Sequence, residues 1–306
     1  MDEILEKAED RGSTVSTSNI NNADGEAEYV YLPSKGVFYK GKFKGLDKLK
    51  VRKLDYTDED ILTTKSYYDN NTLFDEILKN TIVDENGFKA EDLVPIDRDT
   101  IIWWLRIGSF GSEYQIPYTC TNPKCKVKTN IIWDLSDFDM PDLPIEVEEE
   151  IVETGGILIT LPLSKLKCKI TVASIGKELK VHKFLTKRKE TVNKKNPSLN
   201  ITKEFTITGR LLAAIEKVYD ISGKEYSGID ETINWLNSAY NGKPLPIIDS
   251  RYIIKKIKEI TMEVNTKKDI ECPSCNHIEE GVRMPMSIYF FWPEFEELSG
   301  VSNKIN

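Results

Sequence analysis

Hydrophobic residues in the first half of the chain follow two different periods. Between Leu46 and Leu54, the run Leu49-Lys50-Val51-Arg52 alternates apolar and polar residues, which predicts a half-buried strand. Farther along, apolar residues recur three or four positions apart, and this spacing predicts two helices before Gly87. The residues that carry the helical spacing are Leu73, Phe74, Ile77, Leu78 and Ile82.

An apolar helix and a strand close the first half. Asp97 is positioned to cap the helix, which carries a group of apolar residues: Ile101, Ile102, Trp104 and Leu105. A turn at residues 108–111 then leads into a predicted strand from Tyr114 to Tyr118, and this strand runs directly into Cys120.

The second half repeats this order of elements. Residues 156–162 open a second β-rich unit, and Lys169-Ile170-Thr171-Val172 is its next predicted strand. Asp249 precedes another apolar helix and a strand that runs into Cys272. Two helices are predicted in between, one from Leu211, Leu212, Ile215, Val218 and Tyr219, the other from Ile229, Ile233, Leu236 and Tyr240.

The agreement between the halves extends to spacing. Asp97 and Cys120 are 23 residues apart, and so are Asp249 and Cys272. The segment Leu32-Pro33-Ser34-Lys35 corresponds to residues 161–165, with one residue inserted. We therefore predict an α+β fold of two diverged copies of one unit, each ending in a cysteine-bearing β-hairpin. Two unrelated halves with a similar rhythm are the alternative.

Composition divides the chain into four parts. Residues 1–28, the acidic tail, mix Ser, Thr, Asn and Gly with eight carboxylates and two basic residues, for a net charge of −6. We expect this tail to be disordered, with a short helix at Asp2 to Asp10 that forms only on contact with a partner. The first unit covers residues 29–145, the second unit residues 146–298, and a C-terminal tail residues 299–306.

Prolines and acidic residues cluster where the two units meet. The run from Met140 to Glu150 holds two prolines and five carboxylates, which predicts a solvated loop or edge strand at the boundary and not a pair of catalytic carboxylates. The basic stretch from Lys183 to Lys203 is predicted to be an exposed loop or helix end. It lacks the interleaved aromatic residues of a nucleic-acid site.

Charge and motif content argue against several functions. The whole chain of 306 residues has a net charge of −8, which opposes a protein that mainly grips nucleic-acid phosphates. Only two histidines are present, and phosphate-loop, dinucleotide-binding, zinc-protease and EF-hand motifs are lacking, so no enzymatic activity is expected. The apolar runs are too short to span a bilayer, and the acidic start predicts no secretion signal.

Four of the five cysteines form two close pairs, Cys120 with Cys125 and Cys272 with Cys275. Reduced thiols spaced this way are typical of zinc knuckles, so we predict one structural Zn²⁺ ion held by all four cysteines. Because the duplication supplies one knuckle in each copy, zinc would fasten the halves together. Four thiolates leave no open coordination position for hydrolysis.

Two alternatives remain for this site. His277 lies two residues after Cys275 and could replace a cysteine as ligand, and the second pair could have a redox role, although no thioredoxin-like βαβ pattern surrounds it. The fifth cysteine, Cys168, lies in an alternating apolar pattern between Leu166 and Ile170 and is predicted to be core.

The densest aromatic stretch of the chain follows the second knuckle, at residues 284–295. One interpretation is packing beneath the hairpins. The other is contact with a neighbouring protein, because Met and aromatic residues are enriched at the centres of interfaces. The candidate partner-binding residues are Tyr289, Phe290, Phe291, Trp292 and Phe295.

Taken together, these motifs resemble the baseplate hub and hub-assembly family of T4-type contractile-tailed phages. The resemblance runs from about Tyr29 to Phe295, and it is carried by the Leu-Pro-Ser-Lys-Gly start, the two cysteine pairs, Asp249-Ser250-Arg251 and the Phe-Phe-Trp-Pro end. The chain departs from the family in having four residues between Cys120 and Cys125, where two are usual, and in its acidic tail.

The resemblance implies a virion or assembly protein of the tail baseplate with no enzymatic activity. Such a protein would be a zinc-stabilised adaptor that contacts other tail proteins, without membrane or nucleic acid as partners. It would lie in the tail of the virion, or in the host cytoplasm during assembly. The alternative function is a zinc-ribbon nucleic-acid-binding or transcription factor, motivated by the knuckles and the basic stretch.

Overall fold

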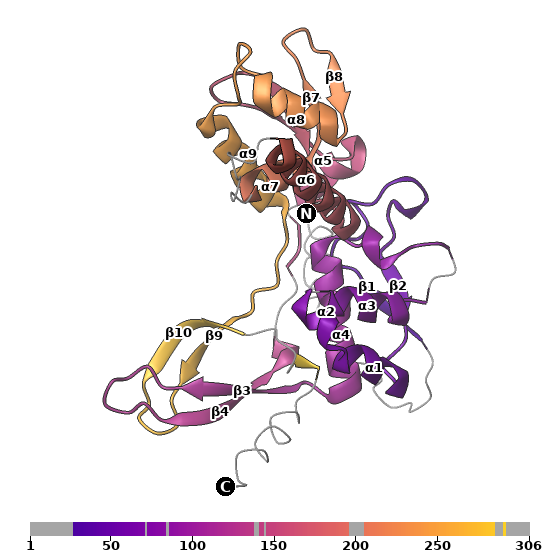
Figure 1. Cartoon of the computed structure of the whole chain (residues 1–306). Helices are drawn as coiled ribbons and strands as arrows, with labels where there is room; N and C mark the ends of the chain where they lie inside the picture. The colour runs from indigo at the N-terminus through magenta and orange to yellow at the C-terminus, as the bar shows by residue number, and fades with distance from the viewer. Residues whose placement is uncertain are drawn as a thin grey trace, which may run out of the picture.

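The structure is a computed structural model and describes residues 27–70, 72–83, 86–137, 141–143, 145–195, 205–284 and 290–291, without the side chains of residues 145 and 146. Helices and small antiparallel sheets alternate along the chain, so the fold is α+β, as predicted. Two lobes lie side by side, and a pair of long hairpins projects from them (Figure 1).

The first lobe begins with a two-stranded antiparallel sheet, β1 (Glu28–Tyr31) and β2 (Lys48–Val51). Leu49 and Val51 are buried, which confirms the predicted alternation over a strand shorter than expected. Three helices follow where two were predicted. They and the 3-10 turns of this lobe are α1 (Glu59–Thr63), α2 (Lys65–Asp69), α3 (Leu73–Thr81), η1 (Gly41–Phe43), η2 (Tyr56–Asp58) and η3 (Ala90–Asp92).

Helix α4 (Pro95–Phe110) runs through the centre of the first lobe and buries Ile101, Ile102 and Leu105. The sequence predicted that Asp97 caps this helix, but Asp97 lies inside it and does not. The cap position is Val94, because Pro95 begins the helix, where a missing N–H costs nothing. The Asp97 carboxylate instead turns inward and binds the loop after β1.

The second lobe is built on a four-stranded antiparallel sheet, and the part of this lobe that the structure describes contains five helices. The strands, in spatial order, are β5 (Ile157–Thr160), β6 (Lys167–Ile170), β7 (Ile215–Tyr219) and β8 (Glu225–Ser227). The helices are α5 (Ile145–Thr154), α6 (Ile175–Lys195), α7 (Thr206–Ala214), α8 (Ile229–Ser238) and α9 (Ile247–Ile260).

Two predictions for this lobe are corrected by the structure, and for the basic stretch it selects the helix end of the two predicted alternatives. Ile215, Val218 and Tyr219 were assigned to a helix but form strand β7, because α7 ends at Ala214 and the next residues pair with β6. Most of the acidic boundary run lies in helix α5, where Ile151 packs into the core. The described part of the basic stretch is helical to Lys195 and belongs to α6.

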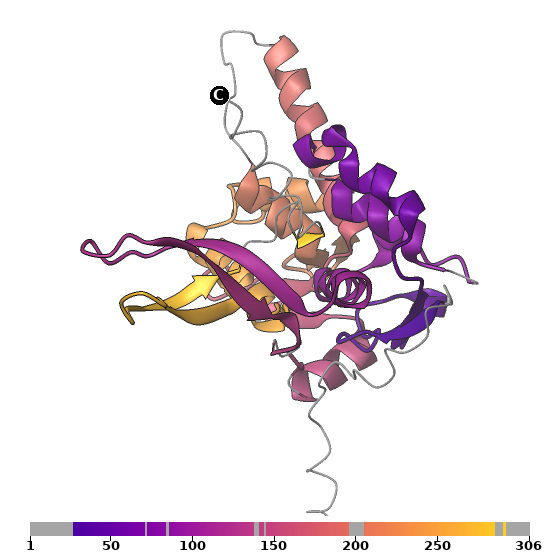
Figure 2. The same cartoon turned by 90° about the horizontal axis from the view of Figure 1, so that it is seen from below.

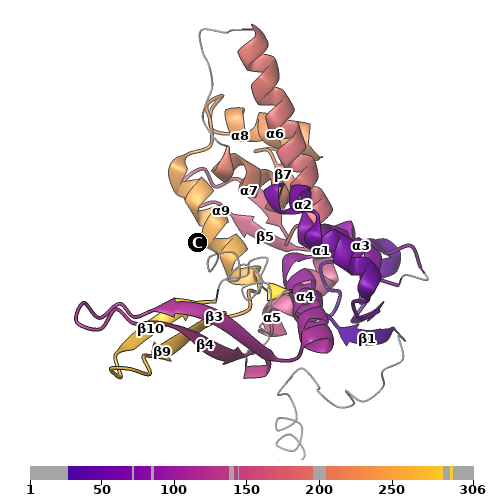
Figure 3. The same cartoon turned by 60° about the horizontal axis from the view of Figure 1, so that its bottom comes forward.

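The two hairpins extend away from the lobes and run next to each other in all three views (Figures 1, 2 and 3). The first consists of β3 (Glu113–Thr119) and β4 (Lys128–Asp134), followed by the turn η4 (Leu135–Asp137). The second consists of β9 (Lys267–Glu271) and β10 (Ile278–Arg283). β3 and β4 pair without a break, whereas β10 has a register shift between Glu279 and Val282.

The lobes share one connected hydrophobic core, and polar contacts also join them. The Ile175 amide donates to the Leu93 carbonyl at 2.9 Å, which ties the start of α6 to the first lobe. Lys40 forms an ion pair with Glu216, and Lys177 forms one with the same carboxylate at 3.5 Å. Among the residues that the structure places, no helix combines the length and the apolar character needed to cross a membrane.

Candidate metal centre

The first cysteine pair lies in the turn between β3 and β4. The Cys120 amide donates to the Val127 carbonyl at 3.0 Å, which continues the strand pairing to the edge of the turn. Asn122 organises the turn itself, because its carbonyl accepts from the amides of Cys125 and Lys126 and its side chain accepts from Lys124. The turn closes at Lys126, whose φ of 49° lies in the left-handed region.

The second pair lies in the matching turn between β9 and β10. The Cys272 amide donates to the His277 carbonyl at 2.9 Å, and the Asn276 amide donates back to the Cys272 carbonyl at 2.9 Å. Asn276 has a φ of 54°, so this knuckle also closes through a left-handed residue directly after its second cysteine. Both turns thus present two sulfurs on the same side of a hairpin tip.

The hairpins bring all four cysteines together, as the sequence predicted. The Cys120 sulfur lies 3.7 Å from that of Cys275, and the Cys125 sulfur lies 3.9 Å from that of Cys272. The four sulfur atoms all lie within 4.8 Å of one another. Each close contact joins the first knuckle to the second, so the cluster belongs to both hairpins equally.

These separations can be compared with what a metal requires. Four thiolates at about 2.3 Å from a tetrahedral zinc ion lie about 3.8 Å from each other. The two shortest sulfur separations, 3.7 and 3.9 Å, match that value. They exclude disulfides, since a covalent S–S bond is about 2.0 Å long. The residues present therefore fit a metal that prefers four soft sulfur ligands.

The local electrostatics favour ionised sulfur in one of the knuckles. Desolvation raises the pKa of the Cys272 thiol, but the amides of Ser274 and Cys275 and the neighbouring thiols outweigh it, and the pKa falls to about 7. The Val127 amide is the largest single influence on Cys125 and lowers its pKa, yet desolvation and the other sulfurs together raise it to about 11. Metal binding here would release protons and weaken as pH falls.

Polar contacts surround the sulfurs and also cross between the hairpins. The Thr121 hydroxyl and the His277 Nε2 atom lie 3.2 Å apart, and the Asn122 amide nitrogen approaches the Cys275 sulfur at 3.7 Å. Among the described residues His277 is not part of the sulfur cluster. Sequence reasoning missed Thr121 and Asn122, although the Asn-Pro pair inside the first knuckle is a turn signal that pointed to Asn122.

Cys168 is fully buried in β6 and lies apart from the cluster, as predicted for a core residue. Burial raises the pKa of its thiol to about 12, so the thiol stays protonated at neutral pH. Cys168 is therefore a matched control for the four clustered cysteines.

The aromatic end packs beneath the hairpins where the structure describes it. Phe290 and Phe291 are fully buried, as expected from the packing interpretation. The Phe290 ring centroid lies 5.7 Å from that of Trp103 and 5.5 Å from that of Tyr114, at the base of β3. The other three candidate partner-binding residues, Tyr289, Trp292 and Phe295, lie outside the described residues.

Buried Arg106 organises the same region and was not anticipated from the sequence. Its guanidinium donates to the carbonyls of Gly111 at 2.6 Å and Glu113 at 2.8 Å, where α4 turns into β3. It also lies over the rings of Tyr114 and Phe290, at 5.8 and 6.0 Å. Burial lowers the pKa of Arg106 to about 10, a cost that these contacts offset.

Comparison with known proteins places the chain in a family. A search of curated proteins and a search of solved structures found no match. A family model described as T4 bacteriophage base plate protein matches residues 29–292, the range that includes both lobes and both hairpins. This match confirms that the resemblance seen in the sequence is to a T4-type baseplate protein, and the chain belongs to the T4 bacteriophage base plate protein family.

Proposed function

We propose that the chain is a non-enzymatic structural or assembly component of a contractile tail baseplate, of the hub or hub-assembly type. In this proposal Cys120, Cys125, Cys272 and Cys275 hold one zinc ion that fastens the two halves of an adaptor. The observation that carries it is the four-sulfur cluster, drawn from hairpins 147 residues apart in a chain of the baseplate family.

The four-cysteine ligand set favours a structural ion over a catalytic one. Catalytic zinc sites keep one position open for water or substrate, whereas four thiolates complete the tetrahedron. The sulfurs of Cys120 and Cys272 are buried, and Cys275 is exposed at the tip. The ion would therefore contribute cohesion between the hairpins and no chemistry of its own.

Matching details in the two halves support the duplication that this arrangement implies. β1 with β2 and β5 with β6 are antiparallel pairs joined by loops that carry the Leu-Pro motifs. A lysine with positive φ follows in each loop, Lys35 at 49° and Lys165 at 61°. The two hairpin strands β2 and β6 bury alternate residues in the same pattern.

The two halves also match at the ends of helices α3 and α7. Helix α3 ends at Thr81, and the next residue, Ile82, pairs with Val51 of β2. Helix α7 ends at Ala214, and the next residue, Ile215, pairs with Ile170 of β6. In both halves the residue after a helix end therefore pairs with the preceding antiparallel pair of strands, as an isolated bridge at Ile82 and as the start of strand β7 at Ile215. We infer that residues 29–145 and 146–298 are diverged copies of one unit.

An adaptor needs surfaces that bind its neighbours. The zinc centre would hold the two copies in one arrangement, so that these surfaces keep their relative positions. The segment after the second knuckle is one such surface in our proposal. Because Phe290 and Phe291 are already covered within the chain, contact with a tail protein is assigned to Tyr289, Trp292 and Phe295. In this reading the buried pair anchors the segment to the hairpins.

Helix α6 provides the observation in favour of the alternative, a nucleic-acid-binding protein. It carries eight Lys or Arg residues and two glutamates, a net charge of +6. The overall charge of −8 opposes that function. We expect no binding to single- or double-stranded DNA or RNA at 50 mM salt. Binding that weakens steeply with added salt would favour the alternative instead.

Zinc content tests the proposal directly. We expect one zinc ion per chain in the purified protein, and its loss in both Cys120→Ser and Cys272→Ser, measured by inductively coupled plasma mass spectrometry. Structural zinc contributes on the order of 10 kcal/mol of binding free energy in small metal-binding domains, so both variants should also melt at much lower temperature. Hydrogen exchange should rise in the two hairpins together.

Cys168→Ala is the matched control and should keep one zinc ion, since its thiol lies outside the cluster. Full zinc occupancy in either serine variant would refute a shared four-cysteine site. The baseplate role has a separate readout. A phage carrying Cys120→Ser should produce few complete baseplates by negative-stain microscopy, and normal baseplates from this variant would refute an assembly role that depends on the zinc centre.

A further inference from the structure

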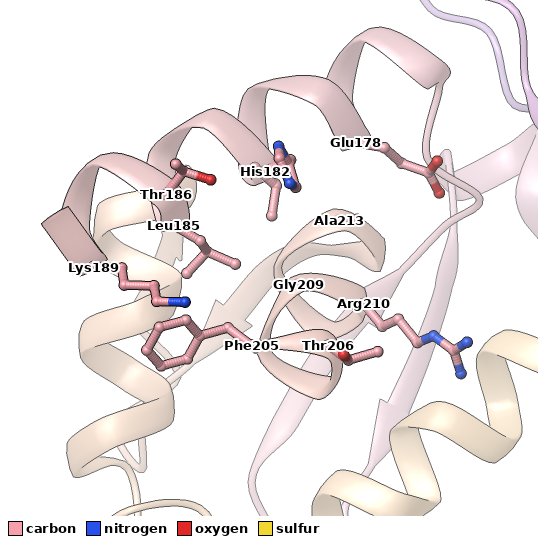
Figure 4. A pocket seen from close by; sticks show the side chains of 11 residues that line it. Glu178, His182, Leu185, Thr186, Lys189, Phe205, Thr206, Gly209, Arg210 and Ala213 are labelled. Atoms are coloured by element: carbon pink, nitrogen blue, oxygen red, sulfur yellow. The ribbon is translucent and has the colours of Figure 1, made fainter. Parts of the chain in front are cut away.

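A groove lies between α6 and α7 in the second lobe (Figure 4). Its volume is about 550 Å³. The floor is apolar and includes Val181, Leu185 and Ala213, all of them buried, with Phe205 at one end. The baseplate and zinc assignments do not account for this groove.

The rim of the groove is polar and mainly basic. Lys189 on α6 and Arg210 on α7 lie at opposite ends of the groove, and His182 lies on α6 between Lys189 and Glu178 (Figure 4). Glu178 is the one carboxylate among the lining residues, and α6 as a whole has a net charge of +6. An apolar floor with a basic rim fits an amphipathic helix whose flanks are acidic.

The chain itself contains such a segment in its acidic tail. Residues 1–10 read Met-Asp-Glu-Ile-Leu-Glu-Lys-Ala-Glu-Asp. As a helix, this segment would place Met1, Ile4, Leu5 and Ala8 on one face, since they follow the i, i+3, i+4, i+7 pattern. Its five carboxylates and one lysine would flank that face. The segment itself carries a net charge of −4, opposite in sign to the two basic side chains of the groove rim, Lys189 and Arg210.

The docking segment is tethered to the described chain. The described chain begins at residue 27, so 16 residues, 11–26, connect the helical segment to it. A flexible linker of that length spans about 20–24 Å on average and at most about 55 Å when extended. A helix of nine or ten residues is marginal alone in water, so this one would form as it docks.

We infer that the α6/α7 groove is the binding site for the chain's own residues 2–10, which dock as an amphipathic helix with Ile4 and Leu5 on the apolar floor. The carboxylates of the helix face Lys189 and Arg210 at the rim. The acidic tail thereby covers the groove in the isolated protein, and a partner with a similar acidic helix would compete with it.

A labelled peptide of residues 1–12 tests this inference on the full-length chain by fluorescence anisotropy. Ile4→Asp/Leu5→Asp removes the apolar face of the resident segment and should leave the groove open. Because a tethered segment competes at an effective concentration of about 1 mM, the peptide should bind this variant at least about tenfold more tightly than the natural chain. Val15→Asp/Ile20→Asp, also in the tail, is the matched control and should behave like the natural chain.

The position of the site is tested by two charge reversals in the open variant. Arg210→Glu changes the rim and should weaken peptide binding at least about fivefold, whereas Lys187→Glu lies on α6 outside the lining and should change it less than twofold. Circular dichroism and zinc content should stay the same in all variants.

Three results would overturn the inference. The peptide does not bind the open variant at 100 µM, or it binds all chains with equal affinity, or Lys187→Glu weakens binding as much as Arg210→Glu. The last result would show general attraction to a basic helix and no groove. Since zinc content is measured in each variant, a failed zinc proposal would remain distinguishable from a failed groove.

Discussion

Asp97 in the first half and Asp249 in the second occupy the same place, the third residue of α4 and of α9, and both are fully buried. The Asp97 carboxylate accepts from the Ser34 amide at 2.9 Å and from the hydroxyls of Ser34 and Tyr39. The Asp249 carboxylate accepts from two backbone amides, at 2.8 and 2.9 Å, in the matching loop. Both halves thus hold a buried carboxylate at the same helix position, and the groups that donate to it differ.

Loss of the buried carboxylate should lower the free energy of unfolding by different amounts in the two halves. Burial raises the pKa of Asp97 although the Ser34 and Tyr39 groups act in the opposite direction. Each buried donor that depends on this carboxylate would be left unsatisfied without it. Three donors depend on Asp97 and two on Asp249. The first half should therefore be the more sensitive one.

The largest effect is expected when each of the two buried carboxylates, Asp97 and Asp249, is replaced in turn. We expect Asp97→Ala to lower the free energy of unfolding by about 3–5 kcal/mol, since an unsatisfied buried donor costs about 1–3 kcal/mol. Asp249→Ala should lower it by about 1–3 kcal/mol, because the amides that donate to Asp249 belong to partly exposed residues. Urea unfolding at pH 7 measures both. Asp60→Ala, at an exposed position of α1, is the control. If either variant matches this control, that half does not need its carboxylate.

A smaller expected effect is a difference between the two halves in how their stability depends on pH. Burial and the nearby Asp97 carboxylate hold the pKa of Tyr39 well above its usual value of 10.0, and no tyrosine donates to Asp249 among the contacts described. Because the folded pKa is raised, the contribution of Tyr39 is complete below pH 10. It is lost as pH rises through the range between the unfolded and folded pKa values, where only the unfolded chain releases the proton.

Tyr39→Phe should therefore cost about 1 kcal/mol of unfolding free energy at pH 8, and this cost should shrink by up to about 1.4 kcal/mol per unit above pH 10. Urea midpoints at pH 8, 9, 10 and 10.5 measure the difference from the natural chain. Tyr29→Phe, at an exposed site in β1, controls for tyrosine in general. A cost that stays constant with pH would contradict the buried phenol–carboxylate pair.

The smallest test compares the two knuckles. Lys126 and Asn276 both have positive φ, but Asn tolerates that region better than Lys. Glycine relieves the strain and loses more backbone entropy on folding, so we expect Lys126→Gly to gain about 0.5 kcal/mol and Asn276→Gly to gain about zero. Melting temperatures at saturating zinc report both. A larger gain at Asn276 would reverse the proposed order of strain.

The cysteine cluster could be located from the sequence because two close pairs of thiols at the tips of predicted hairpins have few other uses. The helical spacing of α8 and the apolar core of α4 were also readable, since both follow from side-chain period alone. What the sequence could not indicate was which sulfur lies next to which. Which sulfurs become neighbours depends on how the tips of the two hairpins meet.

The errors arose where two elements meet. Ile215, Val218 and Tyr219 fit a helical face as well as a strand, and only pairing with β6 decides between them. The carboxylates of residues 146–150 suggested a solvated segment, although glutamate is a good helix former and Ile151 buries one face of α5. Arg106 gave no local signal, because its partners come from the turn and from residue 290.

The separation of the two knuckles has a consequence for synthesis. Cys125 precedes Cys272 by 147 residues, and ribosomes add about 5–20 residues per second. For about 7–30 s, therefore, each new chain displays two thiols of the cluster while the other two do not yet exist. The cluster can close only after most of the chain has been translated, so a prematurely terminated chain would lack it and could be recognised as incomplete.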